Sequence, residues 1–197
     1  GESYVGKSAL IGRFQSGAMP TQLSITIMPD PTKVKNTDHN VHMDFRDTCG
    51  LMEYERLRQL AYRGAQVVIL CFSLDMPDSL ANIEYVWADE IARSCPGRPI
   101  ILVGTKEDLV DNVAVKEELA KCGQHPVKRE EAMEMCKKIG ALKYLQCSAS
   151  SGNGVAEVFE AAVTTVVRQP TFRQPTAKKS KIWNLRRFSK NDLLVEE

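Results

Sequence analysis

Two continuous apolar runs constrain the possible folds of this chain more than any other feature. They read QVVILCFSL at residues 66–74 and PIILVG at residues 99–104. A run of strand length with no polar face is typical of a strand that is buried on both sides in a parallel sheet. Segments with helical periodicity alternate with these runs. The pattern therefore predicts an α/β domain with a doubly wound, mostly parallel sheet and helices on both faces.

The other elements follow from periodicity and from capping signals. Strands are predicted at residues 40–46 and 143–147. A helix that Asp78 or Ser79 can cap is predicted to end near Ser94. Three prolines predict an irregular segment over residues 19–32. The remaining predicted helices lie at residues 7–15, 53–62, 113–121, 129–139 and 155–167.

The composition narrows the class of protein. The length of 197 residues fits one domain, assigned to residues 1–169, and the basic segment 170–197 is expected to be a disordered tail. The 26 basic and 25 acidic side chains nearly cancel, which gives no indication of a nucleic-acid partner. No apolar run reaches the roughly 18–20 residues that span a bilayer. Without any C-x-x-C pair, Cys71 and Cys147 are expected to be buried free thiols of a cytoplasmic protein.

The first eight residues, GESYVGKS, match the phosphate-binding pattern G-x-x-x-x-G-K-S. The glycines permit a tight path that turns backbone N–H groups toward phosphate oxygens, while Lys7 can reach the β- and γ-phosphates and the Ser8 hydroxyl can ligate Mg²⁺. A helix that starts near Lys7 points its positive end at the same phosphates. Because such a loop follows a buried strand, we expect a chain truncated at its N-terminus, without the first strand. The loop residues predicted to contact the ligand are Gly1, Ser3, Val5, Gly6, Lys7 and Ser8.

A second motif, DTCG, follows the strand predicted at residues 40–46. A carboxylate at the carboxyl end of a strand, here Asp47, can hold a Mg²⁺-bound water, and Gly50 lets its N–H group approach a γ-phosphate. Taken alone, the motif is also a common turn. Its position downstream of the phosphate loop favours the metal site.

Two further motifs end strands in the second half of the chain. In the loop TKED, which begins at Thr105, the Lys106 stem can lie along a purine face. The Asp108 carboxylate can accept two hydrogen bonds from guanine N1 and N2, a donor pair that adenine lacks; a solvated charged loop is the alternative. The backbone N–H groups of Ser148 and Ala149 can reach guanine O6. Since ligands bind at the carboxyl ends of strands in such sheets, all four motifs are predicted to meet at one rim.

In this order, the motifs resemble those of the small GTPases of the Ras superfamily and, within it, the Rho family. Two features favour Rho over Ras: the segment YERLRQLAY, and the long spacing from Thr105 to Cys147, which leaves room for an extra helix at about 112–123. The resemblance implies that residues 1–169 form a G domain. The matching segments run from Gly1 to about Val167 and read GESYVGKS, DTCG followed by EYERLRQLAY, ILCFSL, PIILVGTKEDL and KYLQCSAS.

The resemblance implies a molecular switch in signal transduction that binds GTP or GDP with Mg²⁺ and hydrolyses GTP. Thr26 falls where the family's switch I threonine binds Mg²⁺ and the γ-phosphate, but the flanking ITIMPD departs from the family pattern P-T-V-F-E-N-Y. Effector proteins and exchange factors are expected to contact residues 24–30 and 51–62. The protein is expected to be a monomer.

Two positions depart from the family's catalytic pattern. Leu51 occupies the place of the glutamine that orients the attacking water, and its side chain can neither donate nor accept a hydrogen bond. Ser3 replaces a usual glycine, as in the Rnd subgroup, and its side chain can crowd a glutamine or an arginine finger. We therefore expect GTP binding with slow hydrolysis. The alternatives are a GTP-locked effector-binding module without useful turnover and a truncated remnant that binds no nucleotide.

The C-terminal tail has no C-a-a-X box, because no cysteine follows Cys147, so no lipid anchor is expected. Residues 178–190 read KKSKIWNLRRFSK and interleave cations with Ile, Trp, Leu and Phe. Such a pattern favours peripheral contact with an anionic membrane surface or with a partner groove. A solvated tail without a partner is the alternative.

Overall fold

A parallel sheet of three strands, in the order β3-β4-β5, forms the centre of the molecule. The computed structural model describes residues 1–21, 32–36 and 39–168. In the register of the sheet, Leu70 of β3 pairs with Leu102 of β4, which pairs with Tyr144 of β5. All three are buried, as the two apolar runs predicted for Leu70 and Leu102. The strands are β3 (Val68–Ser73), β4 (Ile100–Thr105) and β5 (Lys143–Gln146).

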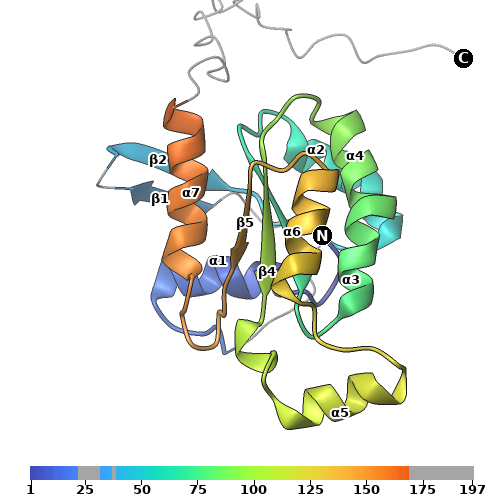
Figure 1. Ribbon diagram of the computed structural model, residues 1–197. Helices are drawn as coiled ribbons and strands as arrows, with labels where there is room; N and C mark the ends of the chain where they lie inside the picture. Colours follow the sequence, from blue (N-terminus) through green and yellow to red (C-terminus); the bar gives the residue numbers. More distant parts are fainter. Residues whose placement is uncertain (22–31, 37–38, 169–197) are drawn as a thin grey trace, which may run out of the picture.

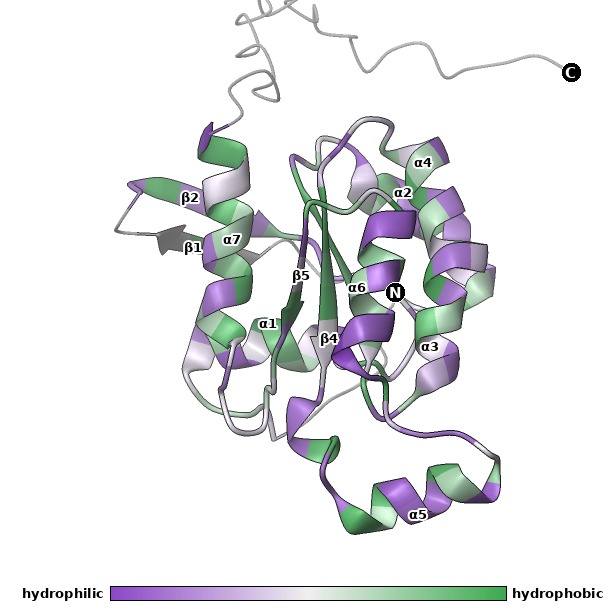
Figure 2. Cartoon of the chain, in the orientation of Figure 1, coloured by the Kyte–Doolittle hydropathy of each residue, from purple (hydrophilic) through white to green (hydrophobic). Residues whose placement is uncertain are grey.

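Helices cover both faces of this sheet (Figure 1). Cys71 belongs to the hydrophobic cluster under one layer of helices, whereas its neighbours Leu70 and Phe72 belong to the cluster under the other. Successive strand residues point to opposite faces, and the apolar strands lie between the helical layers (Figure 2). One layer consists of α1 (Lys7–Ser16) and α7 (Val155–Arg168). The other consists of α3 (Pro77–Asn82), η2 (Ile83–Ala88), α4 (Asp89–Ser94) and α6 (Arg129–Lys138).

The helix predicted to end near Ser94 is present, but its predicted cap was wrong. α3 continues through the π-helical turn η2 into α4, and Met76 is the N-cap residue, without a side-chain cap. Asp78 lies in the first turn. The Ser79 hydroxyl accepts a hydrogen bond from the Ser73 N–H at 2.9 Å. It therefore fastens the helix to the end of β3.

An antiparallel pair of strands lies beside the parallel sheet. β2 (Val41–Phe45) confirms the strand predicted from alternation, and it pairs with β1 (Thr32–Asn36). β1 was not predicted, because its sequence TKVKN carries a single apolar residue. His39, between the two strands, lies 2.6 Å from Glu160 of α7. This contact ties the hairpin to the helical layer.

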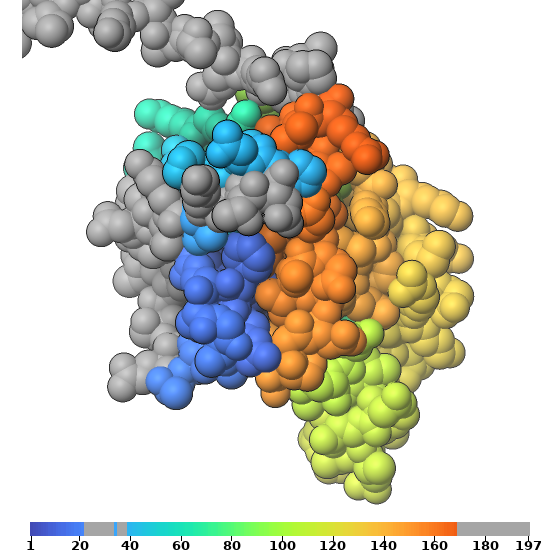
Figure 3. Space-filling model, turned by 90° about the vertical axis from the view of Figure 1, so that its left-hand side faces the viewer, coloured from blue at the N-terminus to red at the C-terminus, as the bar shows by residue number. Residues whose placement is uncertain are grey.

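The helix α5 (Val113–Lys121) projects from the body of the molecule, as Figures 1 and 3 show. It falls in the range predicted for the extra helix. The Asn112 side chain caps it by accepting a hydrogen bond from the Val115 N–H at 3.2 Å. The remaining elements are the 3₁₀ turn η1 (Met52–Tyr54), the helix α2 (Glu55–Tyr62) and the 3₁₀ turn η3 (Glu107–Leu109).

Some predicted features lie outside the described residues: Thr26, the expected partner segment 24–30, and the tail with residues 178–190. Their roles stay predictions. The buried free thiols expected at Cys71 and Cys147 are confirmed. Among the residues that the structure describes, no helix has both the length and the apolar character needed to cross a bilayer.

Candidate functional site

A cavity of about 310 Å³ lies where β4 and β5 end and the N-terminal loop begins. Of the predicted site residues, Gly1, Val5, Asp47 and Ser148 do not line the cavity itself. The motifs nevertheless meet at one rim, because each contributes to the wall. The predicted residues in the wall are Ser3, Gly6, Lys7, Ser8, Gly50, Leu51, Thr105, Lys106, Asp108 and Ala149.

The N-terminal loop takes its shape from left-handed backbone conformations and from one buried threonine. Tyr4 has a φ of 63°, and Gly6, the residue before α1, has a φ of 90°. The Thr105 hydroxyl lies 2.5 Å from the Val5 carbonyl oxygen and 2.9 Å from that of Phe72. The loop, β3 and β4 are therefore fastened to one another at the floor of the cavity.

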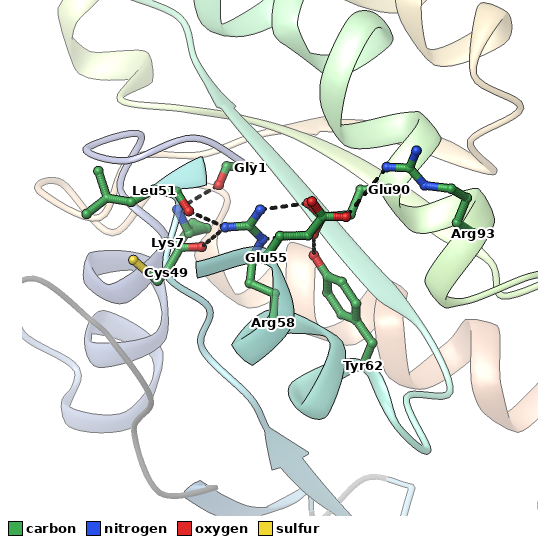
Figure 4. Close-up of polar contacts among 9 residues, drawn as sticks. All are labelled: Gly1, Lys7, Cys49, Leu51, Glu55, Arg58, Tyr62, Glu90 and Arg93. Atoms are coloured by element: carbon green, nitrogen blue, oxygen red, sulfur yellow. Dashed lines mark hydrogen bonds and ion pairs between the residues drawn. The ribbon is translucent and has the colours of Figure 1, made fainter. Parts of the chain in front are cut away.

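Lys7 provides a cation at this floor. Its Nζ donates a hydrogen bond to the carbonyl oxygen of Gly1 at 2.9 Å (Figure 4). It donates another to the carbonyl oxygen of Glu2. Burial lowers the pKa of Lys7, an effect that the nearby Cys71 and Asp47 oppose. A poorly hydrated ammonium group at the N-terminus of a helix is stabilised by an anionic partner. The loop is thus suited to an anion such as a phosphate.

Gly50 lies against the same loop. A Cβ atom at this position would collide with the backbone nitrogen of Ser3 and with the carbonyl group of Glu2. Only glycine allows the DTCG turn to approach the N-terminal loop so closely. The contact between the two motifs therefore consists of backbone atoms.

Two oxygen ligands suitable for a hard cation stand side by side. The Ser8 hydroxyl donates a hydrogen bond to Asp47 Oδ2 at 2.5 Å, and Asp47 Oδ1 accepts one from the Thr48 N–H at 2.9 Å. No group of three or more His, Cys, Asp and Glu side chains that could enclose a metal occurs in the described ranges. A sparse oxygen site of this kind fits Mg²⁺, which keeps waters and binds one or two carboxylates together with ligand phosphates.

The opposite end of the cavity carries the TKED loop. Lys106 has a φ of 58°, and its Nζ forms an ion pair with Asp75 at 3.2 Å. Asp108 lines the cavity. The Ser148 N–H donates to the Asn153 carbonyl oxygen at 2.9 Å, which leaves the neighbouring Ala149 as the residue of this pair that faces the cavity. An acceptor carboxylate and a backbone wall therefore lie at this end.

A buried ion pair holds the segment that leads to Leu51. Arg58 and Glu90 are each 2% exposed, and two hydrogen bonds of 2.8 and 2.7 Å join them. Arg58 Nη1 also donates to the carbonyl oxygens of Cys49 and Leu51, on either side of Gly50 (Figure 4). The backbone around Gly50 is thus anchored to α4.

Two aromatic side chains complete this cluster. The Tyr62 hydroxyl donates to Glu90 Oε1, and the Arg58 guanidinium lies 4.9 Å from the centre of a Trp87 ring. Burial alone would raise the pKa of Glu90, but the hydrogen bonds from Arg58 and Tyr62 outweigh it, so that the pKa of Glu90 is lowered. The pair is therefore ionised at neutral pH.

The sequence analysis missed several residues of this site. Arg58 was noted only within the segment YERLRQLAY. Glu90 and Asp75 were not identified as site residues. Glu90 lies three residues after Trp87 and seven after Ile83, on the apolar side of the helix. An acidic residue at such a position indicates a buried charge with a partner. Asp75 directly follows a predicted strand, which is the kind of position that the other motifs occupy.

Comparisons with known proteins agree with this architecture. The Ras family model matches residues 1–168. The chain is 37% identical over 184 residues to GTP-binding protein rho1 of Schizosaccharomyces pombe, covering 92% of the chain and 91% of that protein. It is 39% identical over 183 residues to GTP-binding protein Rho1 of Kluyveromyces lactis, with 92% and 88% covered. With GTP-binding protein RHO1 of Eremothecium gossypii the identity is 41% over 163 residues, 82% and 79% of the two chains. The chain therefore belongs to the Ras family of small GTPases and, within it, to the Rho family.

Proposed function

We propose that the cavity binds GTP or GDP together with Mg²⁺, and that the protein is a Rho-type switch that hydrolyses GTP slowly. One observation carries this proposal: an anion site at Lys7, a paired oxygen site at Ser8 and Asp47, and the acceptor carboxylate of Asp108 all belong to one rim. A guanine nucleotide carries the complementary groups, namely phosphates, a phosphate-bound metal and a base with two adjacent donors.

The residues present fit such a ligand. The cavity volume of about 310 Å³ is within the range of small-molecule sites. Lys7 and the backbone N–H groups of the N-terminal loop would hold the phosphates, and Lys106 and Asp108 would hold the base. Ser8 and Asp47, with Thr26 predicted alongside them, would hold the metal. Mg²⁺ would supply positive charge to the phosphate oxygens.

Slow hydrolysis follows from the side chain at position 51. Leu51 lines the cavity, and its carbonyl oxygen is held by Arg58, which supports its assignment to the position of the water-orienting glutamine. An aliphatic side chain offers no hydrogen bond to an attacking water. Ser3 adds a side chain to the adjacent wall. The protein would therefore persist in its GTP-bound form, as the GTP-locked alternative also requires.

The test separates binding from turnover. Nucleotide that copurifies with the protein is identified by chromatography, and the affinities for GDP, GTP and ATP are measured with and without Mg²⁺. Single-turnover hydrolysis is then followed with and without a Rho GTPase-activating protein. We expect bound guanine nucleotide, Mg²⁺-dependent affinity and little phosphate release. An affinity for ATP equal to that for GTP would contradict the assignment of a guanine site. Rapid phosphate release in the presence of the activating protein would contradict only the slow hydrolysis.

Partner contact would use the surface next to Leu51. Met52 and Leu60 are 55% and 40% exposed, an unusual exposure for two large apolar side chains on one short segment, and residues 51–62 were expected to contact effectors and exchange factors. Replacing both side chains by serine should weaken binding of a Rho effector domain without changing GDP affinity. Unchanged effector binding would contradict this surface. The predicted monomeric state is checked by light scattering on the same samples.

A further inference from the structure

A side-chain contact joins the two loops at the base end of the cavity, the TKED loop and the turn between β5 and α7. The Asn153 Nδ2 group donates a hydrogen bond to Glu107 Oε2 at 2.7 Å. A backbone hydrogen bond of 3.1 Å, from the Glu107 N–H to the Cys147 carbonyl oxygen, joins the same two segments. Asp108 of one segment and Ala149 of the other line the cavity. The contact between Asn153 and Glu107 therefore helps to set the distance between two parts of the cavity wall.

Asn153 is also the one asparagine of the sequence that a glycine follows. It is exposed, and it lies in the turn before α7, outside any helix or strand. An asparagine loses ammonia when the backbone nitrogen of the next residue reaches its side-chain carbonyl carbon. Glycine has no Cβ atom beside that nitrogen, so it hinders this approach least. Asn153 thus combines the sequence and the exposure that favour deamidation.

The fold requires the glycine at position 154. Gly154 has a φ of 69°, which favours glycine over residues that carry a Cβ atom. A Cβ atom there would also lie 2.2 Å from the Gln146 carbonyl oxygen and 3.1 Å from Cys147 Cα. Glycine is therefore the residue that lets the turn lie against the end of β5. The reactive Asn-Gly pair is built into the junction between β5 and α7.

The reaction consumes only water and involves no oxidation or reduction. The Gly154 backbone nitrogen gives up its proton and forms a bond to Asn153 Cγ. The bond from Cγ to Nδ2 breaks, and Nδ2 leaves with a proton as ammonia, so that a five-membered succinimide remains. Water then adds to one of the two succinimide carbonyl carbons and opens the ring. The product at position 153 is aspartate or isoaspartate, and either one carries a carboxylate in place of the amide.

The new carboxylate would face Glu107, which is half-buried. The amide donor of the 2.7 Å hydrogen bond is then lost, and two like charges repel each other in its place. Isoaspartate in addition lengthens the backbone by one methylene group next to Gly154, where a single Cβ atom already finds no room. Both products therefore push the TKED loop and the turn before α7 apart.

We propose that Asn153 is a site of spontaneous deamidation, and that its conversion to aspartate or isoaspartate loosens the base end of the cavity and speeds release of guanine nucleotide. The effect on release rests on the proposed function, whereas the modification and the separation of the loops do not. Asn153 acts as a positioning residue, through Glu107 and without contact to the base. Because ammonia is lost to solvent, the change accumulates with the age of the protein.

The first experiment measures the modification itself. The full chain is incubated at neutral pH, and peptide mapping by mass spectrometry follows each asparagine, with isoaspartate counted by enzymatic methylation. We expect Asn153 to react on the order of tenfold faster than the reference asparagines, because glycine alone lacks a Cβ atom beside the attacking nitrogen. Glu107→Ala frees the amide and should speed the reaction further. The references precede Val, Ile and Val in the same chain: Asn40, Asn82 and Asn112.

The second experiment measures the consequence with Asn153→Asp, which reproduces the aspartate product. We expect GDP to dissociate about 3- to 10-fold faster, the effect of one lost hydrogen bond, and residues 106–109 and 147–150 to exchange their amide hydrogens faster. Adding Glu107→Gln removes the repulsion and should restore both rates. Asn112→Asp is the matched control, since it makes the same exchange at the N-cap of α5, where aspartate caps as well as asparagine.

Three results would overturn the proposal: deamidation of Asn153 no faster than that of the reference asparagines, unchanged loop exchange and GDP release in Asn153→Asp, and no recovery on adding Glu107→Gln. Hydrogen exchange is measured without nucleotide. A chain that binds no GDP would therefore contradict the proposed function, while the loop exchange of Asn153→Asp would still decide whether the carboxylate separates the loops.

Discussion

In the proposed function, the base preference depends on Asp108. Its carboxylate lines the cavity. The neighbouring carboxylate of Asp75 is paired with Lys106, so Asp108 is the acidic side chain that we expect to accept hydrogen bonds from the base. Asp108→Asn replaces one acceptor oxygen of the side chain by an NH₂ donor. This donor faces a donor of guanine, whereas in xanthine it faces a carbonyl oxygen. We expect GDP affinity to fall about 10- to 100-fold, as for loss of a bidentate contact, and xanthosine diphosphate to bind better than GDP.

The matched control for this exchange is Asp111→Asn. Asp111 is exposed and pairs with Lys116 at 2.8 Å, outside the cavity. Isothermal titration with both diphosphates measures the two variants. If Asp108→Asn retained its preference for GDP, the carboxylate would not be the group that reads the base.

In the proposed function, the side chain at position 51 sets the rate of hydrolysis. A glutamine there would restore an amide that can orient water at the cavity wall, and Ser3→Gly would remove the adjacent side chain. We expect the double variant to hydrolyse bound GTP on the order of 10²-fold faster, the effect of correct orientation of a nucleophile. Single-turnover phosphate release measures it. Met52→Gln, on an exposed neighbour, is the control and should leave the slow rate unchanged; equal acceleration by this control would point to a general loosening of the segment.

At the level of elements, the Arg58–Glu90 pair joins α2 to α4 and fixes the segment between β2 and α2. Glu90→Gln would leave the buried guanidinium without an anion, which typically costs about 3–5 kcal/mol. Urea unfolding at neutral pH measures the free energy of unfolding. Glu55→Gln is the control, because Glu55 and Arg93 are exposed and 3.6 Å apart, and loss of such a surface pair costs about 0–1 kcal/mol.

The same pair predicts an acid dependence of stability. Because the pKa of Glu90 is lowered in the folded state, the unfolded state binds a proton more readily on acidification. The contribution of ionised Glu90 to the free energy of unfolding is thus complete above its ordinary pKa of 4.5. It is lost as the pH falls through the lowered pKa of the folded state. Unfolding free energies from pH 6 to pH 3 should fall more steeply for the natural chain than for Glu90→Gln. Parallel slopes would show that Glu90 is not ionised in the fold.

The elements that the sequence predicted are those whose own residues carry the signal. The apolar runs of β3 and β4 and the phosphate-loop motif could be assigned locally, and they placed the rim correctly. β1 could not, because its single apolar residue gives no alternation and its pairing with β2 decides its conformation. The Arg58–Glu90 contact joins two helices far apart in the sequence. Only the tertiary structure shows that they meet behind Gly50.

At the scale of the whole molecule, the strands of the described residues form two sheets, the antiparallel pair β1-β2 and the parallel sheet β3-β4-β5. The rim of the cavity proposed to bind the nucleotide draws residues from both sheets, since Thr48 follows β2 while Thr105 ends β4. Among the described residues, the two sheets are joined through the helices and through Arg58, which bonds to the Cys49 carbonyl oxygen and to Glu90 of α4. The geometry of the rim therefore depends on how firmly the two sheets are held together.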